Sequence, residues 1–197
     1  MGYDKDFYKM YQDYLQEPTV RAAHDWVISI AKADQHFQDV VDFGCGAFNE
    51  FNIYARPLRY FGIDVNVPSG DPLLIKADYR RISDLGQLFR PTIPPSAFVS
   101  LFSTEITAPK EENYRFYEKV FRELPTVNSG LVSGFYYASK KDVNPIGETG
   151  GVVSYQTLER PEEVSSDLFT ERRLILPVPS KMFGQDVFEV WKLFNRK

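Results

Sequence analysis

The chain has 197 residues, of which 43% are hydrophobic, and this length and composition are typical of one globular domain. Its formal net charge is −4 and no Lys/Arg block stands out, which argues against a duplex nucleic-acid partner. No apolar run approaches the roughly 20 residues that span a bilayer, and no signal-peptide region begins the chain. One cysteine, Cys45, and two histidines, His24 and His36, argue against a disulfide and against a Cys- or His-rich metal centre. A cytoplasmic protein without a membrane partner is therefore expected.

Two helices are predicted before the first strand, and residues 1–37 are assigned to them. Residues 6–16 and 20–31 each place apolar side chains at i, i+3, i+4 and i+7, which is one face of a helix. A strand over residues 39–43 follows. A short helix then begins at residue 49 and ends by residue 56, because Pro57 disfavours helical backbone in the residue before it.

Strands and helices alternate through the core, which is assigned to residues 38–197. Strands are expected at 59–64, 73–76, 97–102 and 131–137, and helices at 82–89 and 111–124. This alternation is typical of βαβ units and a parallel sheet. The pattern then changes to a helix over 161–169 and two strands, 173–178 and 187–194, whose turn-rich connection indicates an antiparallel hairpin. We predict a single α/β domain: a three-layer Rossmann-like sandwich around a seven-stranded, mostly parallel sheet with an antiparallel C-terminal hairpin.

A long connection over residues 138–159 contains paired lysines, Asn-Pro and a glycine-rich cluster. Loops of this length in a compact domain are usually functional or mobile. Two interpretations stay open: a surface insertion, or a lid or substrate loop that follows the fifth strand on the ligand side.

The first strand runs directly into a turn that contains Gly44, Cys45 and Gly46. Glycine adopts backbone angles closed to other residues, and it lets a ligand lie against the main chain. In an open α/β sheet, a nucleotide-like cofactor binds at this place, beyond the carboxyl end of a strand. The turn alone does not identify the cofactor.

Acidic residues stand at the ends of the first three strands: Asp42, Asp64 and Asp78. Asp64 can accept hydrogen bonds from both hydroxyls of a ribose that rests on the glycine turn. Asp78 and the following Tyr79 can reach an adenine base, through a hydrogen bond and through ring stacking. Asp42, just before the turn, suits a cofactor with positive sulfonium and ammonium groups better than a pyrophosphate.

From residue 39 onward the chain resembles the class I S-adenosylmethionine-dependent methyltransferase family. The resemblance rests on Val-Val-Asp-Phe-Gly-Cys-Gly at 40–46, Gly-Ile-Asp-Val-Asn at 62–66, Lys-Ala-Asp-Tyr at 76–79, Phe-Val-Ser-Leu-Phe-Ser at 98–103, and the closing hairpin. It implies S-adenosylmethionine as cofactor and methyl transfer as activity. The cofactor-binding residues that it implies are Asp42, Gly44, Cys45, Gly46, Asp64, Val65, Asp78, Tyr79, Phe102 and Ser103.

Two departures from the family pattern leave alternatives open. Phe48 occupies a position where many members carry a third glycine, and the fourth strand lacks an Asn-Pro-Pro-Tyr type signature. Amino-group methylation of DNA bases or of protein glutamine is therefore unsupported, and a binding protein without turnover remains an alternative. A NAD-type dinucleotide enzyme is a weaker one, because Asn49 stands where that fingerprint requires glycine.

Methyl transfer from a sulfonium is an in-line displacement that requires alignment and, for some acceptors, a general base, but no metal. The candidate bases are Glu105, His24 and Tyr136, with Glu105 the predicted catalytic residue. A helix-capping or solvated carboxylate explains Glu105 equally well, and core packing is the simpler explanation for His24 and Tyr136. The expected acceptor is a small molecule. A protein acceptor and the oligomeric state are left open. The candidate substrate-contacting residues are Tyr11, Tyr14, His24, Thr104 and Tyr136.

Overall fold

The computed structural model describes seven segments of the chain: residues 13–46, 50–67, 70–89, 93–107, 110–137, 166–177 and 187–197. Of the helix expected over residues 6–16, only residues 13–16 are described; residues 13–15 are helical and residue 16 lies in a turn. Tyr11, Phe48, Asn49 and the 138–159 connection lie outside the described residues. The predicted lid or substrate loop and the assignment of the whole chain to one domain therefore stay predictions.

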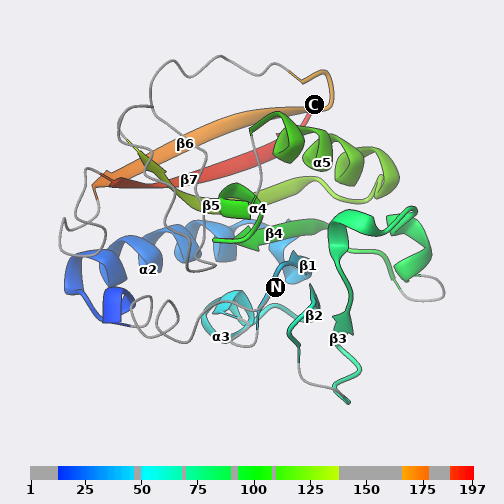
Figure 1. Cartoon of the computed structure of the whole chain (residues 1–197), viewed down its shortest axis with the longest axis horizontal. Helices are drawn as coiled ribbons and strands as arrows, with labels where there is room; N and C mark the ends of the chain where they lie inside the picture. Colours follow the sequence, from blue (N-terminus) through cyan, green and yellow to red (C-terminus); the bar gives the residue numbers. More distant parts are fainter. Residues whose placement is uncertain are drawn as a thin grey trace, which may run out of the picture.

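Within the described residues, seven strands form one sheet in the order β3-β2-β1-β4-β5-β7-β6 (Figure 1). The first five strands pair in parallel, and β7 pairs antiparallel with both β5 and β6. The predicted mostly parallel sheet with an antiparallel C-terminal hairpin is thus confirmed. The strands are β1 (Asp39–Phe43), β2 (Arg59–Asp64), β3 (Leu74–Lys76), β4 (Ala97–Leu101), β5 (Ser129–Tyr137), β6 (Phe169–Pro177) and β7 (Val187–Arg196).

Helices cover both faces of the sheet. Successive side chains of a strand point to opposite faces, so Val40 packs in the core cluster that contains α2 (Pro18–Ala33), and Val41 in the cluster that contains α5 (Lys110–Glu123). Figure 1 shows α2 and α5 on the two sides of the sheet. The other helical segments are η1 (Gln35–Gln38), α3 (Glu50–Ala55), η2 (Tyr79–Arg81), η3 (Leu85–Phe89) and α4 (Thr104–Thr107).

Three predicted elements differ from the structure. The helix expected over 82–89 is reduced to the short 3₁₀ segment η3, because Gly86 within it and Pro91 after it disfavour a longer helix. The helix expected over 161–169 is absent from its described part, residues 166–169: Phe169 begins β6 and packs with Phe194 in the core. Phe102, expected as the last residue of the fourth strand, lies outside β4 in a left-handed conformation with φ 50°.

The strand order places a topological switch point between β1 and β4. From β1 the chain crosses to β2 on one side, and it later returns to β4 on the other side. Ligands of open α/β sheets bind in the crevice at the carboxyl ends of strands where the order reverses in this way. Among the helices in the described part of the chain, none combines the length and the apolar character needed to cross a bilayer.

Candidate functional site at the switch point

The glycine turn leaves β1 at the switch point with two left-handed glycines, Gly44 at φ 77° and Gly46 at φ 61°. A Cβ atom on Gly44 would lie 1.8 Å from the Oγ of Ser103, which follows β4. A Cβ on Gly46 would meet nothing within 4 Å. Gly44 is therefore required for the close approach of the two chain segments, and Gly46 faces open space in which a ligand can lie against the backbone.

The carboxylate of Asp64 lies directly beside this turn. Its Oδ2 accepts a hydrogen bond of 3.1 Å from the Gly46 amide, and its Oδ1 accepts one of 2.7 Å from the Asn66 amide. Val65, the next residue, exposes 41% of its surface although it is apolar. An acid, an exposed apolar side chain and a glycine turn therefore meet at the carboxyl ends of β1 and β2, as expected for a ribose and an adjoining base.

The end of β3 contributes Asp78 and Tyr79 to the neighbourhood of the site. Asp78 caps η2 through the Arg80 amide, with a hydrogen bond of 3.2 Å. The Tyr79 ring is buried, with Phe116 among its core neighbours, and its hydroxyl lies 3.1 Å from the Ser103 Oγ. The hydroxyl thus reaches Ser103, which abuts the glycine turn, while the predicted stacking of the ring on adenine stays a prediction.

A buried polar group lies beneath the turn. The Tyr60 hydroxyl donates a hydrogen bond of 2.8 Å to Oδ2 of Asp42. Burial, together with the carboxylates of Asp42 and Asp64, raises the pKa of the Cys45 thiol well above its ordinary value. Cys45 therefore remains a thiol and acts as a small packing residue, because the thiolate is the nucleophilic form.

The segment after β4 is held to the same turn. The Ser100 hydroxyl donates to the Phe43 carbonyl at 2.7 Å and accepts from the Thr104 amide at 3.2 Å. Phe102 lies between Ser100 and Thr104 in the chain. It has a φ of 50°, and its amide donates to the Ser133 carbonyl at 3.0 Å. A bulky residue in this conformation stores strain, and such strain is concentrated at functional sites.

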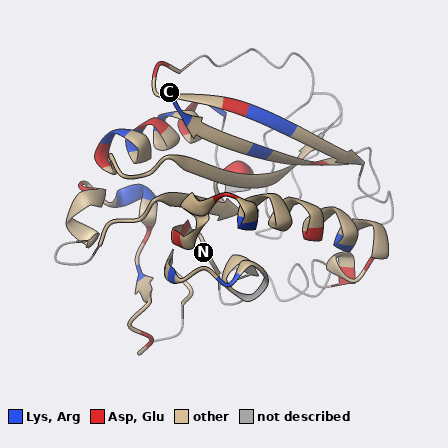
Figure 2. Cartoon of the chain, turned by 180° about the vertical axis from the view of Figure 1, so that it is seen from behind, with Lys and Arg blue, Asp and Glu red and all other residues tan. Residues whose placement is uncertain are grey.

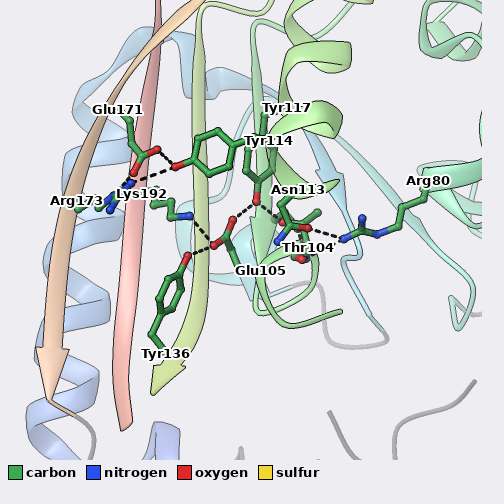
Figure 3. Close-up of polar contacts among 11 residues, drawn as sticks. Arg80, Thr104, Glu105, Asn113, Tyr114, Tyr117, Tyr136, Glu171, Arg173 and Lys192 are labelled. Carbon is green, nitrogen blue, oxygen red and sulfur yellow. Dashed lines mark hydrogen bonds and ion pairs between the residues drawn. The ribbon is translucent and has the colours of Figure 1, made fainter. Parts of the chain in front are cut away.

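Glu105, the predicted catalytic residue, lies in a fully buried polar cluster shown in Figure 3. Its carboxylate accepts from Lys192 Nζ at 2.6 Å and from the hydroxyls of Tyr117 and Tyr136. The Tyr117 hydroxyl also lies 2.8 Å from Thr104 Oγ1. Two of the predicted substrate-contacting residues, Thr104 and Tyr136, are therefore buried members of this cluster.

The surroundings of Glu105 disfavour proton uptake. Burial alone would raise its pKa, but the Lys192 ammonium and the two tyrosine hydroxyls outweigh burial, so the pKa lies below the usual range. Burial, with the Glu105 charge, raises the pKa of Tyr136 well above its ordinary value. Since neither the stabilised carboxylate nor the phenol accepts a proton readily, both are poor candidates for the general base.

A second buried carboxylate, Glu189 of β7, lies on the opposite face of the sheet. It accepts from the Tyr14 hydroxyl and the Trp191 indole, and its Oε1 lies 2.8 Å from His24 Nε2. The His24 ring is parallel to that of Phe102, with centroids 5.9 Å apart. Two more predicted substrate-contacting residues, Tyr14 and His24, are thus brought together at the end of β4.

The predicted residues fall into three groups. The first is the cofactor cradle around the glycine turn, formed by Gly44, Gly46, Asp64, Val65 and Ser103; the others are the Glu105 cluster and the Glu189 cluster. Sequence reasoning missed Glu189 and Lys192, together with Tyr60 and Tyr117. The sequence could have pointed to Glu189 and Lys192, because both interrupt the apolar strand over 187–194. A charged residue in a strand that is covered on both faces requires a buried partner. Within the described residues, no group of three or more His, Cys, Asp or Glu side chains is placed to hold a metal ion.

Comparison with known proteins identifies the fold. No protein-family profile matches the sequence, and no curated protein matches it significantly. The small RNA methyltransferase HEN1 superimposes with a TM-score of 0.60 at 12% identity, over 90% of this chain and 25% of that chain. The PH0226 protein from Pyrococcus horikoshii OT3 superimposes with a TM-score of 0.59 at 12% identity, over 98% of this chain and 100% of that chain. DhpI in complex with SAH gives 0.51 at 12% identity, over 92% and 89%. The chain has the fold of the class I S-adenosylmethionine-dependent methyltransferases.

Proposed function

We propose that this protein binds S-adenosylmethionine at the switch point and transfers its methyl group to a small-molecule acceptor. The observation that carries the proposal is the position of the Asp64 carboxylate, 3.1 Å from the Gly46 amide beside open space. The residues present fit the cofactor: Asp64 would bind the ribose hydroxyls, Val65 would pack against the adenine, and Gly44 with Gly46 would support the methionine portion.

The negative groups around the turn fit a cationic cofactor. Asp42 is buried beneath the turn, and its tyrosine partner, Tyr60, is a neutral donor. A buried carboxylate favours a nearby positive charge more strongly than it would in water, because the local dielectric constant is low. This charge favours a sulfonium and an ammonium group over a pyrophosphate, and therefore favours S-adenosylmethionine over a dinucleotide.

When bound, the cofactor supplies an activated methyl group with a good leaving group. The task of the chain is then to bind, align and dehydrate the reactants. The rigid end of β4, with Phe102 stacked on Phe135 and Ser103 against the glycine turn, provides a fixed wall for that alignment. A general base is needed only for acceptors that lose a proton on methylation.

A small-molecule acceptor is favoured over nucleic acid by charge. The net charge is −4, and in Figure 2 basic and acidic residues are interspersed along α2 and α5 rather than gathered in one basic stripe. Proteins that bind RNA or DNA phosphates usually carry such a stripe. The likeness to HEN1 concerns the fold and covers 25% of that chain.

Calorimetric titration with S-adenosylmethionine, S-adenosylhomocysteine and NAD tests the cofactor. The first two should bind and NAD should not. Asp64→Ala should weaken S-adenosylmethionine binding about 10- to 100-fold, because hydrogen bonds to a charged acceptor are worth roughly 1.5–3 kcal/mol. Asp167→Ala is the matched control, since Asp167 is exposed before β6, and it should leave the affinity unchanged. Unchanged affinity in Asp64→Ala would contradict the ribose assignment.

The acceptor is tested with labelled S-adenosylmethionine and a panel of small molecules, proteins and small RNAs. Transfer to small molecules supports the proposal. Transfer confined to RNA or to proteins would contradict the acceptor class, and binding without any transfer would identify a binding protein that has no turnover.

A further inference from the structure

We infer that His24 is the general base of the proposed methyl transfer and that Glu189 is the positioning residue that orients it and stabilises its protonated form. The inference rests on the proposed function. It assigns a role to the polar cluster on the α2 face, which the binding of the cofactor does not use. Glu189 is fully buried in the middle of this cluster, on β7.

The position of the His24 ring places it at the site. It stacks on Phe102 at an interplanar angle of 13° and meets Trp191 edge-on, with centroids 5.0 Å apart. Phe102 directly precedes Ser103, which abuts the glycine turn. The imidazole is therefore held between two aromatic rings, next to the strained end of β4 that borders the cofactor cradle.

The contact with Glu189 determines which ring nitrogen is available. Nε2 of His24 is buried 2.8 Å from Oε1 of Glu189, and within the described residues this contact is an ion pair without a hydrogen bond. The nearby carboxylate charge favours a proton on Nε2, which leaves Nδ1 to accept a proton. The charge of a carboxylate at this distance stabilises the imidazolium that forms when Nδ1 takes up a proton. The Tyr14 hydroxyl and Trp191 indole that also donate to Glu189 fix the carboxylate itself.

An acceptor X–H loses its proton to Nδ1 of His24, and the freed electron pair of X forms the bond to the methyl carbon. The carbon–sulfur bond breaks, and its electron pair returns to sulfur as a neutral thioether. The products are methylated acceptor, S-adenosylhomocysteine and an imidazolium paired with Glu189, which later releases its proton to solvent.

Among the described residues, the charged and titratable groups around His24 and its partner Glu189 come from three elements. Glu189 faces it from β7 and Tyr14 from the helical residues before α2, while Arg21 and Asp25 of α2 line with it a cavity of about 20 Å³. That volume has room for about one water molecule, which suits proton exchange. Burial, with the Glu189 charge, raises the pKa of Tyr14, so Tyr14 stays a donor and does not compete as base.

The first test needs no acceptor, because the chain has two histidines and therefore only two sets of imidazole signals in the NMR spectrum. Saturation with S-adenosylhomocysteine should shift the signals of His24, which should show the tautomer protonated at Nε2. His36 is the matched control: it lies within η1, which precedes the amino end of β1, and its Nδ1 is 2.8 Å from Asp34 Oδ1, so its signals should not shift. If S-adenosylhomocysteine binds by calorimetry but the His24 signals do not move, the inference is wrong. If S-adenosylhomocysteine does not bind, the proposed function is wrong, and the inference that rests on it is wrong as well.

The second test measures turnover with the acceptor that the panel identifies. His24→Gln should lower kcat by about 10²- to 10³-fold, and Glu189→Gln by about 10-fold, at unchanged affinity for S-adenosylmethionine. In the wild type, kcat should fall at acid pH because a protonated base is inactive, and His24→Gln should remove this dependence. His36→Gln should behave as wild type. A His24→Gln enzyme that keeps kcat within about three-fold, or keeps the acid limb, would overturn the assignment.

Discussion

Two glycines in one turn have different physical roles, and the difference is measurable. A Cβ on Gly44 would overlap the Ser103 hydroxyl, and φ 77° is in addition unfavourable for a side chain. A Cβ on Gly46 at φ 61° would meet open space. Gly44 therefore serves the packing of β1 against the end of β4, and Gly46 serves access to the ligand.

We predict that Gly44→Ala lowers the free energy of unfolding more than Gly46→Ala does. Gly46→Ala should cost about 1–2 kcal/mol for the left-handed conformation alone. Gly44→Ala adds the displacement of Ser103, for a total of about 2–5 kcal/mol. Urea denaturation of both variants measures the difference, and equal destabilisation would show that the Ser103 contact is not tight.

At the scale of elements, one buried ion pair joins α4 to β7. The side chains of Glu105 and Lys192 are 0% and 2% exposed, and Tyr117 of α5 and Tyr136 of β5 donate to the same carboxylate. Because a buried charge without a partner is far more costly than a matched pair, the four elements depend on one another through this contact.

Lys192→Met should therefore reduce the free energy of unfolding by about 3–5 kcal/mol, since it leaves Glu105 charged and buried. The double variant Glu105→Gln/Lys192→Met should be more stable than Lys192→Met, because the neutral amide oxygen still accepts from the tyrosines. Lys119→Met is the matched control: Lys119 pairs with Glu123 near the surface, and its loss should cost less than about 1 kcal/mol. A double variant no better than the single one would mean that charge is not the reason for the loss.

For the whole molecule, the parts that the sequence predicted are those that depend on local order. The alternation of strands and helices follows from side-chain periodicity, and the turn at Gly44 follows from residue type, so the sheet and the cofactor side were predictable. The buried pairs were not, because their partners are distant in the sequence: Glu105 and Lys192 are 87 positions apart, and Tyr14 and Glu189 are 175 apart. Periodicity contains no information on which strand becomes the neighbour of which. Glu105 was therefore assigned to the site from its position after β4 alone, because the sequence does not show that the Lys192 ammonium pairs with it.

The same buried pair predicts how the whole fold responds to acid. The pKa of Glu105 is lowered in the folded state, whereas in the unfolded chain it returns to about 4.3. Below that value the unfolded state binds more protons than the native state, so acid favours unfolding. The stability that Glu105 contributes is therefore complete above about pH 4.3 and is lost as the pH falls through the lower, folded pKa.

Urea titrations at a series of pH values between 7 and 3 measure this loss as a decrease in the free energy of unfolding. Glu105→Gln/Lys192→Met has no titrating group at this position, so its decrease below about pH 4.3 should be smaller than that of the wild type. The other carboxylates are common to both proteins, and their contribution cancels in the comparison. If the free energy of unfolding falls with pH in parallel for the two proteins, Glu105 has the same pKa in the folded and unfolded chains. The Lys192 ammonium would then not lower the pKa of Glu105.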